Sequence, residues 1–153
     1  MVLKIAHDAV PLDALSVEVE ARNAWLERSG FYERRQLGSG IFIDRAAIER
    51  RSQRRTSDIL RTVSGVRVTA TYDGVDIMMR SAGKTSIVNR NCRPPIYVDG
   101  IIVAAPLGDR IDLHAILPGD IEAIEAYSGP AQVPPKYGGA YAACGVVLIW
   151  TRK

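Results

Sequence analysis

The sequence has few of the residues from which metal and catalytic sites are built. Only two cysteines and two histidines occur in 153 residues, and no CxxC pair or zinc-type Cys/His spacing is present. The GxSxG, HExxH, P-loop and GxGxxG patterns are also absent, so no nucleophile, metal-bound water or phosphate loop is indicated. The carboxylate pairs Asp109/Asp112 and Glu122/Glu125 are interpreted as exposed residues and caps. We therefore predict a protein that is not an enzyme and carries no metal or cofactor.

Long apolar segments are missing as well. The longest apolar run, from Gly145 to Trp150, has the length of a strand, whereas a membrane-spanning helix needs about 20 residues. The opening residues, MVLKIAHDAVPLDAL, lack the apolar core of a secretory signal peptide. We expect no transmembrane segment, and if the protein is exported, its signal lies outside this sequence.

A large excess of charge of one sign is also lacking, because the net charge is only +3. The basic residues are nevertheless unevenly distributed along the sequence, and one cluster of them contains only two acidic residues, Glu49 and Asp58. A solvated helix face explains the cluster best, since no aromatic residues are interleaved with it, and we expect no nucleic-acid partner. The alternative is a cytosolic nucleic-acid-binding domain, which salt-sensitive DNA binding would support. The clustered residues are Arg45, Arg50, Arg51, Arg54, Arg55 and Arg61.

The helical signals are short. Asp44 is an N-cap candidate for a helix over 44–51, and a second helix over 56–65 ends at Gly65, where a left-handed residue belongs. Pro118-Gly119-Asp120 starts a segment in which Ile121, Ile124 and Tyr127 recur at spacing three, and we expect a short helix there that runs into a strand. Two or three short helices are therefore expected.

The strand signals are short too. Asp73-Gly74 predicts a hairpin over 66–80, and Asp99-Gly100 predicts a second one over 96–103. The closing segment, 145–151, is apolar on both faces, which is typical of the centre of a sheet. Together with the helices, these strands predict an α+β fold with a small mixed sheet of short hairpin strands.

Four stretches occur in an order that resembles the plug domain of TonB-dependent outer-membrane receptors. They are 41–44 with 57–66, the strand 76–80, the IYVDG stretch 96–100, and the series 117–130, 137–139 and 145–151. The resemblance implies a non-catalytic, periplasm-facing domain at the outer membrane of a Gram-negative-type bacterium. Such plugs occlude a β-barrel and move when a periplasmic energy-transducing protein pulls on an N-terminal segment after a ligand binds outside.

The resemblance sets the expected domain organisation. Residues 41–153 form the plug-like domain, and residues 1–40 form an N-terminal strand and linker at the end of a preceding regulatory domain. Residues 23–40 read as a polar, irregular loop. No barrel sequence follows Lys153, so two hypotheses remain open: a plug that gates a receptor barrel, and a stand-alone plug-like subunit of another membrane protein complex.

The two cysteines gain a role from the same resemblance. Cys92 lies just before the IYVDG strand and Cys144 just before the closing strand, so we expect a disulfide between them if the protein is exported. A bridge that closes a loop of roughly 50 residues stabilises by about 4 kcal/mol in the chain-entropy model.

The resemblance also suggests contact residues. Arg80 and Glu125 match positions at which receptor plugs meet the barrel wall, and the alternative for each is an ordinary surface or intradomain ion pair. The loops 81–93 and 130–143 are further candidates by position, because loops carry binding more often than sheets do. The residues proposed in the first loop are Lys84, Asn89, Arg90, Asn91 and Arg93.

Overall fold

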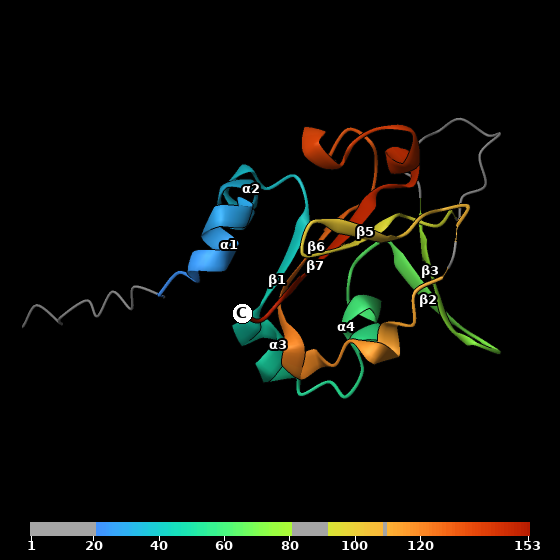
Figure 1. The fold of residues 1–153 in the computed structure, drawn as a ribbon, viewed down its shortest axis with the longest axis horizontal. Coiled ribbons are helices and arrows are strands. Elements are labelled where there is room, and N and C mark those ends of the chain that lie inside the picture. The colour runs from blue at the N-terminus through green and yellow to red at the C-terminus, as the bar shows by residue number, and fades with distance from the viewer. Residues whose placement is uncertain (1–20, 81–91, 109) are drawn as a thin grey trace, which may run out of the picture.

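The computed structural model describes residues 21–80, 92–108 and 110–153, which form an α+β fold around a five-stranded mixed sheet (Figure 1). The strand order is β1-β6-β7-β4-β5, and β4 pairs in parallel with β7 while the other neighbours are antiparallel. The strands are β1 (Ile41–Asp44), β4 (Ile96–Val98), β5 (Ile101–Ala104), β6 (Ile121–Tyr127) and β7 (Val146–Thr151).

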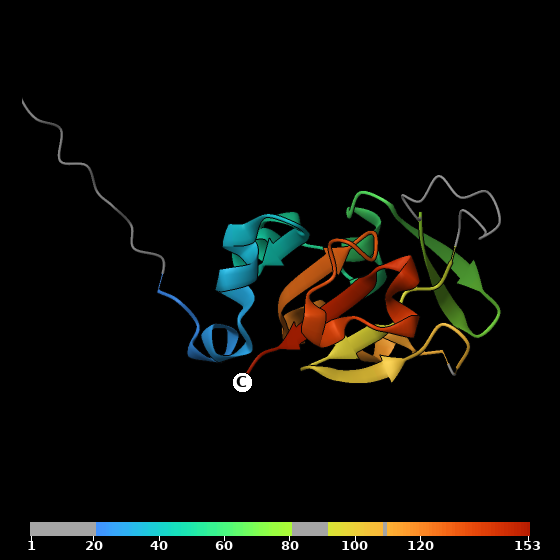
Figure 2. The ribbon, with the colours of Figure 1, turned by 90° about the horizontal axis from the view of Figure 1, so that it is seen from above.

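A separate antiparallel hairpin and several short helices surround this sheet. The hairpin consists of β2 (Val66–Thr71) and β3 (Gly74–Met79). Figure 2 shows it at one end of the molecule and α1 and α2 at the other. The α-helices are α1 (Ala24–Ser29), α2 (Phe31–Leu37), α3 (Arg45–Arg51) and α4 (Thr56–Arg61), and the 3-10 turns are Leu113–Ala115, Pro118–Asp120, Pro135–Tyr137 and Ala140–Cys144.

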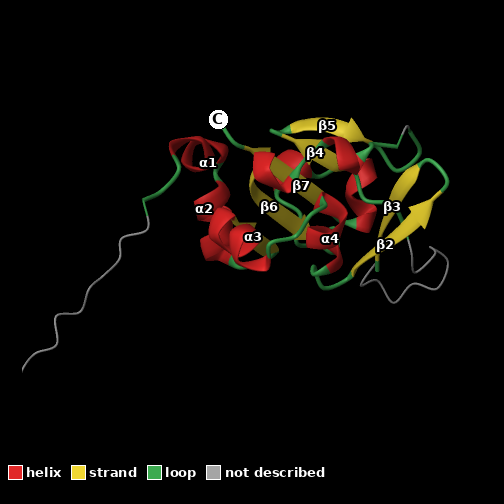
Figure 3. Cartoon of the chain, turned by 90° about the horizontal axis from the view of Figure 1, so that it is seen from below, coloured by secondary structure: helices red, strands yellow, loops and turns green. Residues whose placement is uncertain are grey.

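The sheet is covered on both faces, with the closing strand β7 between two cores. Val147 and Ile149 face the core formed with α3, α4 and the β2–β3 hairpin, and α3 and α4 lie in front of the strands in Figure 3. Val146, Leu148 and Trp150 face the core formed with α1, α2 and the segment 133–142. The predicted central strand is thus confirmed, since β7 has β6 on one side and β4 on the other.

Both predicted hairpins form, the first with its turn one residue earlier than predicted. Val66 pairs with Met79 and Thr71 with Gly74, so the two turn residues of the first hairpin are Tyr72 and Asp73, and Gly74 is the first residue of β3. In the second, Asp99 and Gly100 have φ values of 51° and 84°. Two successive positive φ values are the geometry that a tight two-residue hairpin turn requires.

The expected irregular loop over 23–40 is wrong. Asn23 caps α1 by accepting from the backbone N–H groups of Trp25 and Leu26, and Gly30 and Gly38 end α1 and α2 in the left-handed conformation. The apolar residues of this stretch pack onto the sheet. Tertiary burial therefore stabilises two helices of six and seven residues, which are too short to be stable alone.

The expected helix at 121 is also wrong, because Ile121–Tyr127 is a single strand. It pairs with β1 on one side and β7 on the other, and nearly all of its residues are buried. Burial on both faces removes the polar/apolar alternation that marks a half-exposed strand, so the spacing of three was misleading. A 3-10 turn, Pro118–Asp120, precedes the strand.

Candidate functional site at the junction of the N-terminal helices and the sheet

A buried carboxylate joins the N-terminal helices to the centre of the sheet. Glu125 on β6 has no exposed surface. Its Oε2 accepts from Nε of Arg34 (2.8 Å) and from the hydroxyl of Tyr127 (2.5 Å). Its Oε1 accepts from Nη2 of Arg34 (2.6 Å) and from Nε1 of Trp150 (2.7 Å). Four donors thus satisfy the carboxylate, as a buried charge requires.

Arg34, on α2, is held in place by its own surroundings. Its Nη1 donates to the carbonyl of Ser29 at the end of α1 (2.7 Å), and its guanidinium lies 5.8 Å from the ring centres of both Tyr137 and Trp150. The side chain is only 13% exposed. Arg34 therefore connects α1, α2, β6 and β7 through one planar group.

The environment shifts the protonation equilibria toward a stable ion pair. Burial by itself lowers the pKa of Arg34, but the hydrogen bond and charge of Glu125 outweigh it and raise that pKa above the usual value. Burial, followed by the hydrogen bond to Glu125, strongly raises the pKa of Tyr127. At neutral pH Arg34 is therefore charged and Tyr127 keeps the proton that it donates.

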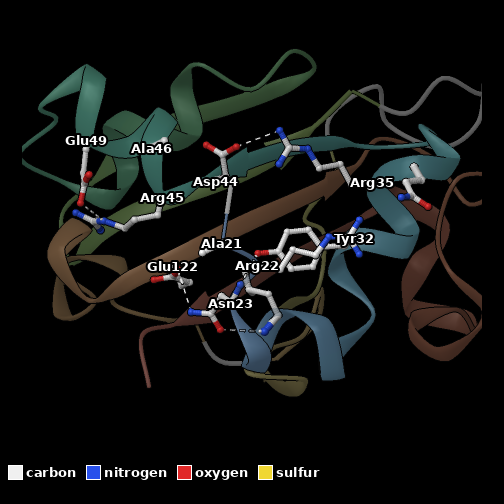
Figure 4. Close-up of a pocket in the computed structure, with 12 residues that line it drawn as sticks. Ala21, Arg22, Asn23, Tyr32, Arg35, Asp44, Arg45, Ala46, Glu49 and Glu122 are labelled. Carbon is white, nitrogen blue, oxygen red and sulfur yellow. Dashed lines mark hydrogen bonds and ion pairs between the residues drawn. The ribbon is translucent and has the colours of Figure 1, made fainter. Parts of the chain in front are cut away.

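A polar groove lies beside this cluster, where α1 and α2 meet β1 and α3 (Figure 4). It has a volume of about 500 Å³. Arg35 pairs across it with Asp44 (3.0 Å), and the side-chain amide of Asn23 donates to Glu122 (3.0 Å). These contacts join the helical pair to β1 and β6, so the groove is part of the same attachment.

The disulfide is present, between Cys92 and Cys144, with a Cα–Cα distance of 5.6 Å. Because β4 and β7 are parallel neighbours, their first residues lie at the same end of the sheet, and each cysteine comes shortly before one of these strands. Cys92 also exchanges backbone hydrogen bonds with Met79 (2.9 and 3.2 Å). The bridge thus ties the β2–β3 hairpin and the segment before β7 to one end of the sheet.

The structure places the predicted contact residues in different environments. Arg80 is exposed after β3, and its backbone N–H donates to the carbonyl of Gly65 (2.9 Å). Arg93 forms an ion pair with Asp76 (2.9 Å). The four other candidates of the loop lie outside the described residues: Lys84, Asn89, Arg90 and Asn91.

Glu125 requires a correction as a contact residue. It is fully buried and bonded to Arg34 inside the domain, so it presents no surface to another chain in this structure. The intradomain ion pair, which was the alternative for this residue, is what the geometry shows. In the middle of a strand that is covered on both faces, a carboxylate needs its hydrogen-bond donors inside the domain.

Sequence reasoning missed Arg34, because residues 30–35 lay outside the recognised motifs. A partial signal was available, because a carboxylate within an apolar strand needs a buried donor. Across 21–80, 92–108 and 110–153, no group of three or more potential metal ligands occurs. None of the helices described is long and apolar enough to cross a bilayer.

The sequence profile of the TonB-dependent Receptor Plug Domain matches residues 34–144, a range that begins at Arg34. The chain belongs to this family. Plug domains sit within the β-barrels of outer-membrane receptors and are components of transport rather than enzymes. The expected resemblance is therefore confirmed, while the proposed boundary between residues 40 and 41 stays a prediction.

Solved receptor structures contain the same plug fold. A mutant of the ferric enterobactin receptor PfeA from Pseudomonas aeruginosa, in complex with enterobactin, is 27% identical over 76% of this chain and 18% of its own, with a TM-score of 0.53. The siderophore receptor PirA from Acinetobacter baumannii is 26% identical over 75% of this chain and 17% of its own, with a TM-score of 0.53. This chain thus spans less than a fifth of these receptors. Among curated proteins no match was found.

Proposed function

We propose that this plug domain closes the lumen of an outer-membrane β-barrel and opens it when a periplasmic energy-transducing protein pulls on the N-terminal segment. Family membership supports the closing role. The observation that carries the opening step is the bidentate pair of Arg34 and Glu125, which joins the N-terminal helix α2 to the interior of the sheet.

The structure suggests how a pull would be transmitted. Tension that enters ahead of α1 reaches Asn23, Ser29 and Arg34 in turn, and each of these is bonded to the next helix or to the sheet. The disulfide lies outside this path, because it joins the segments before β4 and β7. The N-terminal helices can therefore detach while the end of the sheet at Cys92 and Cys144 stays closed.

The transported class is proposed from the relatives. The similar receptors are named for ferric enterobactin and for siderophores, and we propose a ferric siderophore as the ligand of the receptor in which this plug acts. The domain would then face the periplasm at the outer membrane. Arg80 and the loop 81–93 are the proposed contacts with the barrel or another partner, with Arg93 anchored at its end by Asp76.

A graft tests the closing role. Residues 21–153 replace the plug of the PfeA barrel, and the conductance of the purified receptor is measured in planar bilayers. The graft is expected to reduce the conductance to that of the intact receptor, while the barrel without any plug stays open. A folded graft with its disulfide formed that leaves the pore open would contradict the proposal and favour the stand-alone subunit.

The opening step has a separate test in the same graft. Replacing Arg34 by Met is expected to make the closed pore leak at a lower pulling force, or after milder urea treatment, than the unaltered graft. Arg28→Met is the matched control, because Arg28 is exposed on α1. Equal behaviour of the two variants would show that the buried pair does not govern opening.

A further inference from the structure

A basic cavity lies on the side of the domain formed by α3 and α4, away from the buried Glu125. It has a volume of about 330 Å³ and opens between the connection from α3 to α4 and the residues that precede β6. Arg54, Arg55 and His114 line it, and no acidic side chain of the described residues does. Both arginines are exposed, and neither forms an ion pair with another described residue.

Most of the neighbouring arginines, in contrast, are already engaged. Arg45 and Arg61 pair with carboxylates of their own helices (2.7 and 2.5 Å), and Arg51 donates to the hydroxyl of Thr62. Within the arginine cluster, Arg54 and Arg55 are thus the two that line the cavity and have no ion-pair partner among the described residues. Uncompensated positive charge in a concave site raises the local concentration of anions.

The walls of the cavity are fixed by hydrogen bonds. The buried hydroxyl of Thr56 donates to the carbonyl of Ile116, which connects the start of α4 to the segment before β6. The side-chain amide of Gln53 donates to the carbonyl of Asp58 (3.0 Å) and holds the connection that carries Arg54. A site whose walls are already positioned loses less conformational entropy when a ligand binds.

The second wall is apolar. Ile116, Leu117 and Pro118, from the segment before β6, also line the cavity, and Leu117 is 57% exposed. We propose that the cavity binds an organic phosphate, with the phosphate group against Arg54 and Arg55 and the carbon portion against this apolar wall. A phosphate monoester carries about −1.5 to −2 charges at pH 7, which matches two arginines better than a single carboxylate does.

Titration of the purified chain with inorganic phosphate and with phenyl phosphate tests the proposal, with binding followed by amide NMR shifts at low ionic strength. Phenyl phosphate is expected to bind more tightly than inorganic phosphate, because only the ester reaches the apolar wall. Arg54→Gln and Arg55→Gln should each weaken phenyl phosphate binding by about fivefold or more, which corresponds to one exposed charge-assisted contact. Arg28→Gln, an exposed arginine on α1, should leave it unchanged.

Two further arms define the ligand. Leu117→Ser should remove the preference for phenyl phosphate over inorganic phosphate while leaving the latter bound. Vesicles of phosphatidylglycerol in phosphatidylcholine distinguish a lipid headgroup from a soluble phosphate. If the chain binds these vesicles and Arg55→Gln abolishes that binding, the ligand is a lipid headgroup. If the chain does not bind the vesicles, the ligand is a soluble phosphate ester.

Three results would overturn the inference. The first is no shift of residues 54–56 and 113–118 with either phosphate. The second is an equal loss of binding in Arg28→Gln, which would show general attraction to a basic protein. The third is binding of an oligoglutamate peptide at these residues in the absence of any phosphate response, which would assign the cavity to an acidic protein segment. None of these outcomes depends on whether the domain gates a barrel.

Discussion

Replacing Arg34 by Met tests whether the buried ion pair holds the N-terminal helices on the sheet. Glu125 has no exposed surface, and Arg34 is 13% exposed, so the variant leaves an interior carboxylate with only two donors, from Tyr127 and Trp150. Removing one partner of a buried pair costs about 3–5 kcal/mol. Because two hydrogen bonds to the carboxylate remain, we expect a loss of about 3 kcal/mol in the free energy of unfolding.

Glu125→Gln is the complementary change. A Gln amide nitrogen at the Oε1 position would face two N–H donors, from Arg34 and Trp150. At the Oε2 position it faces Arg34 and a hydroxyl of Tyr127 that can turn to accept. The second orientation leaves one donor of Arg34 unpaired and its charge without a carboxylate, but the bond to Ser29 and the contacts with the Tyr137 and Trp150 rings remain, so we expect a cost of about 2 kcal/mol.

The double variant isolates the pair. With Met at 34 and Gln at 125, no charge is buried, and the amide can bond to both Tyr127 and Trp150. The double variant should therefore lose about 2 kcal/mol rather than the roughly 5 kcal/mol that additivity requires.

Urea unfolding of the oxidised protein measures these differences as shifts of the midpoint at constant slope. Arg28→Met is the control, because Arg28 is exposed on the same helical pair, and it should stay within about 0.5 kcal/mol of the wild type. A loss of under about 0.5 kcal/mol for Arg34→Met, or an additive cycle, would refute the reasoning.

Three other predictions concern the same core. Burial and the bond to Glu125 raise the pKa of Tyr127 above the value of about 10 that it has in the unfolded chain. The neutral side chain therefore contributes to the free energy of unfolding below that pH, and the contribution is lost as the pH rises further, by up to about 1.4 kcal/mol per pH unit. Tyr127→Phe should therefore flatten the alkaline fall in unfolding free energy. Replacing Cys92 and Cys144 by Ser opens a loop with a sequence separation of 52 and should cost about 4 kcal/mol in urea unfolding, with a 2 Da mass change on reduction of the wild type alone; a mass unchanged on reduction would argue against the bridge. Gly145→Ala places a Cβ 1.9 Å from the carbonyl oxygen of Tyr127 at a φ of +90° and should lower the melting temperature strongly or prevent folding, whereas Gly129→Ala, with open space around it, should not; equal melting temperatures would contradict this.

The features that were predicted correctly depend on neighbours in the sequence. Asp99-Gly100 specifies a two-residue turn because both residues tolerate a positive φ, and the hairpin follows. The closing strand was placed in the centre of the sheet because both of its faces are apolar. The disulfide was expected from the family's order of motifs, and the parallel pairing of β4 and β7 explains its geometry.

The features that were missed depend on contacts between distant segments. The helices over 24–37 form because their apolar side chains pack against the face of the sheet that carries Tyr127 and Trp150. Within 121–127, pairing with β1 and β7 overrides a helical spacing. The role of Glu125 changed for the same reason, since its partner Arg34 is 91 residues away.

The family, the two hairpins, the central closing strand and the lack of catalytic motifs could be predicted from the sequence, because each is encoded in a local pattern or in the order of such patterns. Which charges are paired depends on the folded chain. Packing placed Arg34 against a buried carboxylate and left Arg54 and Arg55 facing an open cavity. Burial and proximity set the energy of a charge, and both are properties of the folded chain.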